Sequence, residues 1–280
     1  MTKVYDRHLK KVVEVKHFGG NTLNKIYKNK ILTKITTSHL ISKCYGIYNG
    51  SKWSRKKIEK FIKENQIDMN LYQKEDYACF NDFFIRKLKK VEFDTKKDHL
   101  TSPVQGYLLA YPIKENLTLK VKECVYTLDE LFDGENLSNY KNGVVLIFRL
   151  ALNNYHHFHH IDDGKCIKRK VIKGRLHTVS DSSKSYKIYQ ENAREYSVLK
   201  TKNFGEMIYM EVGALLVGKI INYNDDTFTR GMDKGYFLPG GSTVILVLNH
   251  VKVDSDILEH SKKNMETKVE VGEKVGVVKC

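Results

Sequence analysis

The chain has 280 residues, with 48 lysines and arginines against 33 aspartates and glutamates. A hydrophobic share of 41% and a charged share of 29% are typical of a globular protein and exclude a disordered or low-complexity chain. No apolar run approaches the roughly 18 residues that a membrane-spanning helix needs, and the first residues lack the apolar stretch of a secretory signal. The composition predicts a cytoplasmic protein, either soluble or peripherally bound to a membrane.

The positive charge is concentrated in the N-terminal third. Residues 1–100 contain 23 Lys and Arg against 11 Asp and Glu, whereas residues 101–280 contain 25 against 22. Such asymmetry is typical of a protein that binds an anionic membrane surface or nucleic acid, although a lysine-rich solvated surface gives the same count. No RNP motif, zinc-finger spacing or helix-turn-helix supports nucleic acid, so we favour the membrane surface of the two polyanions.

Residues 1–95 are predicted to be a basic helical segment that associates with a membrane. Apolar residues recur at helical spacing between Ile31 and Tyr48, and Ser54 can cap a second helix with lysines opposite its apolar face. Basic amphipathic helices of this kind either pack on the main body or lie on an anionic bilayer, where each Lys or Arg contributes on the order of 1 kcal/mol. The predicted helices cover residues 31–48, 55–65 and 81–90, after an irregular stretch over residues 1–30.

Residues 96–280 are predicted to form a β-rich catalytic body of sandwich-like or barrel-like shape, which makes the fold class α+β. Residues 117–121 alternate between apolar and polar, as in a half-buried strand, and continuous apolar runs indicate buried strands. Thr127 and Glu130 have the spacing of a capping box at the start of a short helix. The predicted strands cover residues 117–121, 144–150, 206–221 (one strand or two, with bulges at Gly213 and Gly218) and 242–248.

Four histidines lie within the segment Tyr155-His156-His157-Phe158-His159-His160. In a strand, His157 and His159 share one face. Imidazoles are common metal ligands, but no cysteine or glutamate stands at zinc spacing from them. We therefore expect no metal and favour general acid–base chemistry by one or two of these histidines.

A second segment, Phe237-Leu238-Pro239-Gly240-Gly241-Ser242-Thr243, leads directly into an apolar strand. Adjacent glycines allow backbone conformations that other residues avoid. A strained peptide bond between Gly241 and Ser242 is open to attack by the Ser242 hydroxyl on the Gly241 carbonyl. Taken alone, the same tetrapeptide also fits an ordinary turn before a strand.

Six motifs occur in a fixed order along the chain. They are Phe80-Asn81-Asp82-Phe83-Phe84-Ile85-Arg86-Lys87-Leu88, Ser102-Pro103-x-x-Gly106, Arg149-Leu150 followed by Tyr155-His156-x-Phe158-His159, Glu211-Val212-Gly213-Ala214 followed by Val217-Gly218, Arg230-Gly231-x-x-Lys234-Gly235-Tyr236-Phe237, and Gly240-Gly241-Ser242-Thr243. Together they resemble the phosphatidylserine decarboxylases, most closely the form found in clostridia and related bacteria. The resemblance extends over roughly residues 50–250.

The resemblance implies a proenzyme that cleaves itself between Gly241 and Ser242. The products would be a β chain of residues 1–241 and an α chain of residues 242–280, which form a heterodimer. The Ser242 Oγ would attack the Gly241 carbonyl to give an ester, and elimination followed by hydrolysis would leave a pyruvoyl group in place of the serine. The protein would in this way generate its own cofactor.

The resemblance also implies roles for two histidines and a substrate. His159 matches the base that takes the Ser242 proton, and His156 matches a histidine implicated in decarboxylation. The pyruvoyl ketone would form a Schiff base with the amine of phosphatidylserine and accept electrons as CO₂ leaves. We expect His156 to protonate the resulting carbanion, so that phosphatidylethanolamine is released. The implied partner is phosphatidylserine in an anionic membrane, with the protein on the cytoplasmic face and without nucleic acid.

One departure from the family pattern concerns the residue that orients the catalytic histidine. The family has Ser-Pro-x-Asp-Gly, whereas this chain has Gln105 in place of the aspartate. Glutamine cannot stabilise an imidazolium, but its carbonyl can accept a hydrogen bond from the His159 Nδ1. We therefore predict slower or differently assisted maturation, with Asp162, Asp163 or Asp181 as substitute carboxylates. The alternative is a maturation-deficient, lipid-binding pseudoenzyme.

Two further expectations concern the substrate. The segment over residues 176–183 departs from the family pattern where it is expected to line the site. The sequence does not identify the residues that bind the lipid phosphate, and Arg149 and Arg194 are candidates for that role only because they are expected near the site.

Overall fold

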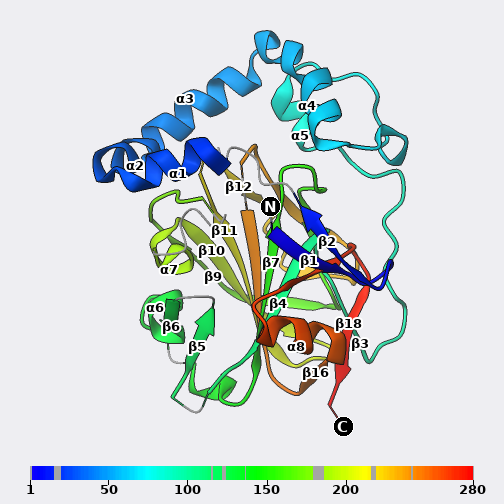
Figure 1. Cartoon of the computed structure of the whole chain (residues 1–280). Helices are drawn as coiled ribbons and strands as arrows, with labels where there is room; N and C mark the ends of the chain where they lie inside the picture. The colour runs from blue at the N-terminus through cyan, green and yellow to red at the C-terminus, as the bar shows by residue number, and fades with distance from the viewer. Residues whose placement is uncertain are drawn as a thin grey trace.

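The structure is a computed structural model that describes residues 2–15, 20–114, 116–121, 124–135, 137–178, 186–215, 219–240 and 242–279. It is an α+β fold in which a helical segment lies across one end of a β-rich body (Figure 1). Within these ranges, no helix is both long and apolar enough to cross a membrane.

The helical segment is built from shorter helices than the sequence predicts. The pattern between Ile31 and Tyr48 divides into two helices after Thr36, because the Ser38 side chain accepts a hydrogen bond from the Ile41 N–H and caps a new helix there. The elements are α1 (Gly20–Lys28), α2 (Lys30–Thr36), α3 (His39–Gly50), the 3-10 turn η1 (Lys52–Lys57), α4 (Ile58–Asn65), the 3-10 turn η2 (Met69–Leu71) and α5 (Phe80–Phe84).

Ser54 does not cap a helix, contrary to the prediction. It is buried inside η1, where its hydroxyl donates to the Asn49 carbonyl and accepts from the Phe80 N–H. Ser54 therefore joins η1 to α3 and α5. The apolar residues of α4 and α5 pack into one small core, which contains Ile58, Tyr77, Phe80, Phe83 and Phe84.

The body is organised by a ten-stranded mixed sheet. Its neighbouring strands are antiparallel, except that β1 runs parallel to β17. In order across the sheet, the strands are β13 (Thr227–Phe228), β9 (Gly164–Ile172), β10 (Arg194–Thr201), β11 (Glu206–Gly213), β15 (Ser242–Leu248), β7 (Val144–Leu150), β4 (Gly106–Pro112), β17 (Glu266–Val269), β1 (Thr2–Asp6) and β2 (Lys11–Val15).

Smaller elements complete the body. One three-stranded sheet contains β12 (Ile220–Asn222), β14 (Asp233–Phe237) and β8 (His157–His159), and another contains β16 (Val251–Val253), β18 (Lys274–Val278) and β3 (His99–Thr101). A hairpin joins β5 (Thr118–Val121) to β6 (Cys124–Thr127). The helices are α6 (Leu128–Phe132), the 3-10 turn η3 (Ser138–Tyr140), α7 (Ile188–Glu191) and α8 (Ser255–Lys262).

Alternate residues of β15 belong to two different cores, one on each face of the large sheet. Val244 and Leu246 belong to the first core, and Ile245 and Val247 belong to the second. The first core also contains Phe158 of β8 and Phe237 of β14. The small sheet that carries the histidine motif therefore packs on the same face of the large sheet as Val244 and Leu246.

Several local predictions are confirmed. The strands over residues 144–150 and 242–248 are present with those bounds, and Thr127 forms the capping box with Glu130. The stretch 206–221 gives two strands, β11 and the start of β12, and Gly213 ends the first of them, whereas Gly218 lies outside the described residues. A sandwich-like or barrel-like closure of the body stays a prediction.

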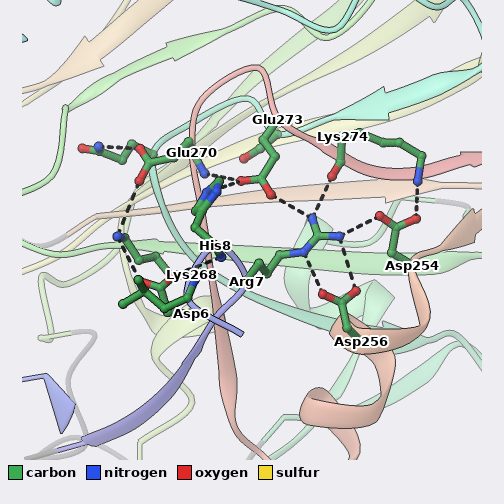
Figure 2. A network of polar contacts seen from close by, with 12 residues as sticks. Asp6, Arg7, His8, Asp254, Asp256, Lys268, Glu270, Glu273 and Lys274 are labelled. Atoms are coloured by element: carbon green, nitrogen blue, oxygen red, sulfur yellow. Dashed lines mark hydrogen bonds and ion pairs between the residues drawn. The ribbon is translucent and has the colours of Figure 1, made fainter. Parts of the chain in front are cut away.

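Residues 2–15 differ from the prediction, because they form two strands joined by a turn rather than an irregular stretch. β1 pairs with β17, and β2 pairs with β1 at the edge of the large sheet. Directly after β1, the Arg7 guanidinium is held by the carboxylates of Asp254, Asp256 and Glu273 and by the carbonyl of Lys274, a set that we call the Arg7 network (Figure 2). The start of the chain is thus bound to its last 40 residues.

Candidate active site

Ser242 is the first residue of β15, in the middle of the large sheet. It pairs with Leu150 of β7 on one side and with Gly213 of β11 on the other. The residue is fully buried, and its Oγ has no hydrogen-bond partner among the described residues. A buried polar atom without a partner calls for an explanation, and a catalytic role is one of those that apply.

The chain reaches Ser242 from β14 through a short crossing that begins after Phe237. The Phe237 N–H donates to the His156 carbonyl over 3.0 Å. Gly240 has φ +146°, a conformation that side-chain-bearing residues rarely adopt. Gly241, which contributes the carbonyl of the predicted scissile bond, lies outside the described residues. His156 therefore lies where the crossing begins and Ser242 where it ends.

His159 is the last residue of β8 and is almost fully buried. Its Nδ1 lies 3.0 Å from the Gly231 carbonyl and its Nε2 lies 3.3 Å from the Tyr155 hydroxyl. A carbonyl can only accept, so Nδ1 carries the hydrogen and Nε2 carries the lone pair. Burial lowers the pKa of His159, and the nearby Asp233 charge opposes this only in part. The imidazole is therefore neutral near pH 7, in the tautomer that a general base needs at Nε2.

His156 lies in a different environment, although it is only three residues away. Its ring packs at 4.0 Å from the Phe84 ring, and its Nδ1 donates to the Asn154 carbonyl over 2.9 Å. Its Nε2 is buried and has no partner among the described residues. Burial, followed by the Arg86 charge, lowers the pKa of His156 to about 3. His156 is therefore a neutral imidazole with an open lone pair.

The predicted hydrogen bond from the His159 Nδ1 to Gln105 is not formed, because the Gly231 carbonyl takes that position. The Gln105 carbonyl instead accepts from the Tyr155 N–H over 2.8 Å, and its amide donates to Glu270 over 2.6 Å. A direct hydrogen bond between Ser242 and His159 is not present either, since the Ser242 Oγ has no described partner.

The predicted substitute carboxylates are engaged elsewhere. Asp162 accepts hydrogen bonds from the backbone and side chain of Asn203, and Asp163 accepts from the Arg230 N–H. Asp181 lies outside the described residues, as does most of the segment 176–183 that was expected to line the site.

The carboxylate beside the histidine motif is Asp233, which the sequence analysis missed. It pairs with His159 across β14 and β8, and its side chain binds the His157 Nδ1 at 2.9 Å. Burial acts to raise the pKa of Asp233, but the His157 hydrogen bond and the Lys87 charge lower it overall. His157 and His159 share one face of β8, as predicted, and both lie beside the Tyr155 ring. No group of three or more metal-binding side chains occurs in the described part of the chain.

A buried ion pair lies behind this face, and the sequence analysis missed it as well. The Lys234 ammonium lies 2.6 Å from the carboxylate of Glu211, and both side chains are almost fully buried. Burial raises the pKa of Glu211, and the Lys234 charge counteracts this increase. Both residues belong to motifs that carried the family resemblance, and this membership was the only sign in the sequence that they lie near the site.

The two arginines proposed for phosphate binding are already occupied. Arg149 forms a buried ion pair with Glu266, and Arg194 donates to backbone carbonyls, among them that of Leu131. Neither guanidinium is available for a phosphate in this arrangement, so that expectation was wrong.

Comparison with known proteins agrees with the motifs. The family model described as phosphatidylserine decarboxylase matches residues 80–277. The chain is 48% identical to phosphatidylserine decarboxylase proenzyme 2 of Clostridium acetobutylicum, over 98% of this chain and 97% of the relative. It is 42% identical to the phosphatidylserine decarboxylase proenzyme of Clostridium botulinum over the full length of both, and 40% identical to that of Clostridium tetani over 100% of this chain and 99% of the relative. These likenesses span both the helical segment and the body, so the chain belongs to the phosphatidylserine decarboxylase family of carboxy-lyases.

Proposed function

We propose that the chain cleaves itself between Gly241 and Ser242 and then decarboxylates phosphatidylserine with the pyruvoyl group formed from Ser242. The observation that carries the proposal is the Ser242 hydroxyl, which is fully buried at the start of a central strand without a described partner. Ser42 and Thr243 also have buried hydroxyls without a described partner, but Ser242 directly follows the Gly240-Gly241 pair of the family motif. The proenzyme names of the relatives support the same conclusion.

His159 is the base in this proposal. Its Nε2 lone pair faces the Tyr155 hydroxyl, and its Nδ1 is held by the Gly231 carbonyl. When the Ser242 Oγ attacks the Gly241 carbonyl to form an ester, its proton passes to the His159 Nε2. The same proton then passes to the Ser242 nitrogen as the bond from the Gly241 carbon to that nitrogen breaks. The Gly231 carbonyl fixes the tautomer, which is one task that an aspartate performs in other Ser–His pairs.

His156 moves a proton in the decarboxylation. Its buried Nε2 lone pair can accept a proton from the substrate ammonium and return it to carbon after CO₂ has left. Because His156 is neutral at rest, we propose that it acts first as a base and only then as an acid, rather than as an acid alone. The pyruvoyl group would supply a ketone for the substrate amine and a sink for the electrons of the bond that breaks.

The two products of cleavage stay together as a heterodimer in this proposal. The segment 242–280 contributes β15 and β17 to the large sheet and β16 and β18 to a smaller one. β15 is buried along its whole length between β11 and β7. Release of this segment would expose both cores, so the noncovalent contacts suffice to hold it.

Helices α2 and α3 supply the proposed membrane contact. Their buried side chains are polar, namely those of Thr33, Ser42 and Asn49. Their apolar side chains face outward, and exposed lysines lie among them, an arrangement suited to an anionic bilayer. We define the α2–α3 surface by the exposed residues Ile31, Leu32, Ile35, Leu40, Ile41, Ile47, Tyr48 and Trp53, together with Lys30, Lys34, Lys43 and Lys52.

A peripheral position on the cytoplasmic face of the membrane follows from this proposal. The helical segment (residues 1–95 in the predicted division, apart from the strands at its start) faces the lipid, and the body carries the reaction. Phosphatidylserine itself supplies the negative surface charge that the lysines attract. The pseudoenzyme alternative receives no support from the relatives, which are named as decarboxylase proenzymes.

Release of CO₂ from phosphatidylserine in vesicles tests the function. The wild-type chain is expected to release CO₂, and Ser242→Ala is expected to release none. Ser197→Ala removes a buried serine of β10 in the same sheet and serves as the matched control, with activity retained. Decarboxylation by Ser242→Ala would refute the assignment.

A further inference from the structure

Glu270 and Gln105 form a close contact between the two segments that cleavage would separate. The Gln105 amide nitrogen lies 2.6 Å from the Glu270 Oε2. Glu270 directly follows β17 and is itself held in place, because its N–H donates to Glu273 of the Arg7 network over 2.8 Å (Figure 2). Glu270 is therefore held in place through both its backbone N–H and its side-chain carboxylate.

This contact determines which way the Gln105 amide points. A carboxylate can only accept, so the NH₂ end of Gln105 faces Glu270 and the carbonyl end faces away from it. That carbonyl accepts the Tyr155 N–H over 2.8 Å. Glu270 thereby fixes the backbone at the start of the histidine motif, through one intervening side chain.

Tyr155 in turn contacts the proposed base. Its hydroxyl lies 3.3 Å from the His159 Nε2, and its ring lies 5.8 Å from the His159 ring at an interplanar angle of 30°. Burial raises the pKa of Tyr155 far above neutrality, so its hydroxyl remains a donor. A shift of the Tyr155 backbone would displace the group that holds Nε2.

We propose that Glu270 is a positioning residue for His159, acting through Gln105 and Tyr155, and that Glu270 and Gln105 together replace the single aspartate expected at position 105. The proposal rests on the proposed self-cleavage, because its first readout is the rate of that step. It also implies that residues 242–280 supply a positioning group as well as the pyruvoyl group.

Charges around Glu270 set the size of the expected effect. The Lys268 ammonium lies 3.8 Å away, Tyr107 and Glu273 are also near, and the Glu270 side chain is 36% exposed. Water and Lys268 therefore screen part of any change in charge. We expect rate changes of about tenfold rather than complete loss of cleavage.

An exchange of the two side chains tests the proposal. Gln105→Glu places two carboxylates in contact, whereas Gln105→Glu combined with Glu270→Gln restores one donor facing one acceptor and keeps an acceptor for the Tyr155 N–H. The full chain is synthesised in a cell-free system, and appearance of the 242–280 fragment is followed by mass spectrometry. Gln105→Glu is expected to slow cleavage about tenfold, and the double variant to recover to within about threefold of wild type.

The pH profile separates positioning from a merely structural role. Contact between like charges raises the pKa of one carboxyl, so lowering the pH from 8 to 5 favours a shared proton in Gln105→Glu. Its rate relative to wild type should rise over that range, while the ratio for the double variant stays flat. Melting temperatures in the uncut Ser242→Ala background check that each variant folds.

The possible outcomes distinguish this inference from the proposed function. If the wild-type chain is never cut, the proposed function fails. If the wild type is cut but Gln105→Glu matches it, or if the double variant is no faster than Gln105→Glu, the inference about Glu270 is overturned. Recovery in the double variant, together with the acid-dependent gain of Gln105→Glu, supports it.

Discussion

Arg149 of β7 and Glu266 of β17 form a two-point ion pair in the interior, with the Arg149 Nε 2.9 Å from one Glu266 oxygen and a second nitrogen on the other. Both side chains are at most 8% exposed. Burial alone would lower the pKa of Arg149, but the Glu266 charge raises it overall. The pair joins residues 1–241 to residues 242–280, because its two members lie on either side of the proposed cleavage point.

Removal of Glu266 should therefore strongly destabilise the fold. Glu266→Ala leaves a buried guanidinium without its carboxylate, and we expect a loss of about 3–5 kcal/mol in the free energy of unfolding. Urea denaturation in the Ser242→Ala background measures this without interference from cleavage. Glu64→Ala, which breaks an exposed pair with Lys60, is the control and should cost less than about 0.5 kcal/mol. Equal effects of the two variants would contradict this account.

The Arg7 network should stabilise the association of the two segments after cleavage. Arg7→Ala removes a planar donor that binds three carboxylates, and we expect the free energy of association of the two segments to weaken by about 2 kcal/mol. Arg7→Lys keeps the positive charge but lacks the planar guanidinium with its several donors, so it should retain only part of this association energy. Size-exclusion chromatography of the processed protein in sub-denaturing urea shows whether the 242–280 fragment elutes separately. Arg55→Ala, which breaks an exposed pair with Asp76, should leave the elution unchanged.

Mild acid should destabilise the fold through its buried histidines. Burial is the main cause that lowers the pKa of His156 to about 3 and that of His160 to about 2. Below pH 6.5 the unfolded chain binds protons at these positions and the folded chain does not, so stability falls as the pH falls. Each histidine contributes a slope of about 1.4 kcal/mol per pH unit in the range from pH 6 to 5.

Unfolding free energies of the Ser242→Ala protein between pH 7.5 and 5 measure that slope. His160→Asn removes one position at which only the unfolded chain binds a proton. It should therefore reduce the slope by about 1.4 kcal/mol per pH unit. His250→Asn replaces an exposed histidine and should leave it unchanged. An unaltered slope in His160→Asn would show that His160 is not held neutral by burial.

The α2–α3 surface should bind anionic vesicles through its apolar side chains. Trp53 is the only tryptophan, and its side chain is exposed, so its fluorescence should shift to shorter wavelength on binding. Replacement of Ile31, Ile35 and Leu40 by serine should lower the affinity for phosphatidylserine vesicles, measured by co-sedimentation, at least tenfold. A tenfold change corresponds to about 1.4 kcal/mol of binding free energy. Serine at Ile167 and Val171 of β9 is the matched control, because both side chains are exposed on a strand of the body. Equal loss in both variants would place the contact elsewhere.

Local sequence patterns predicted the central strands well. Residues 144–150 and 242–248 are continuous runs of mostly β-branched and aliphatic side chains, and each is buried along its entire length. The capping box at Thr127 was equally recognisable, because both of its partners lie within one helical turn. The motif order also indicated the family, which the relatives then confirmed.

Features that depend on distant parts of the chain could not be predicted. β1 and β2 form because β17, more than 250 residues away, offers an edge for pairing. The partner of Gln105 is Glu270, 165 residues further along, so the sequence analysis placed the Gln105 carbonyl on His159 instead. The helix over residues 31–48 was predicted from its apolar spacing, but Ser38 offered a competing cap.

The intact mass of the freshly purified full chain under denaturing conditions tests the central claim most directly. The account predicts a fragment of roughly 4.5 kDa for the 39 residues from Ser242 onward, at the mean residue mass of a 32.5 kDa chain. It should be about 17 Da lighter than the same peptide with an N-terminal serine, because ammonia is lost when the pyruvoyl group forms. A single 32.5 kDa species after prolonged incubation would contradict the account.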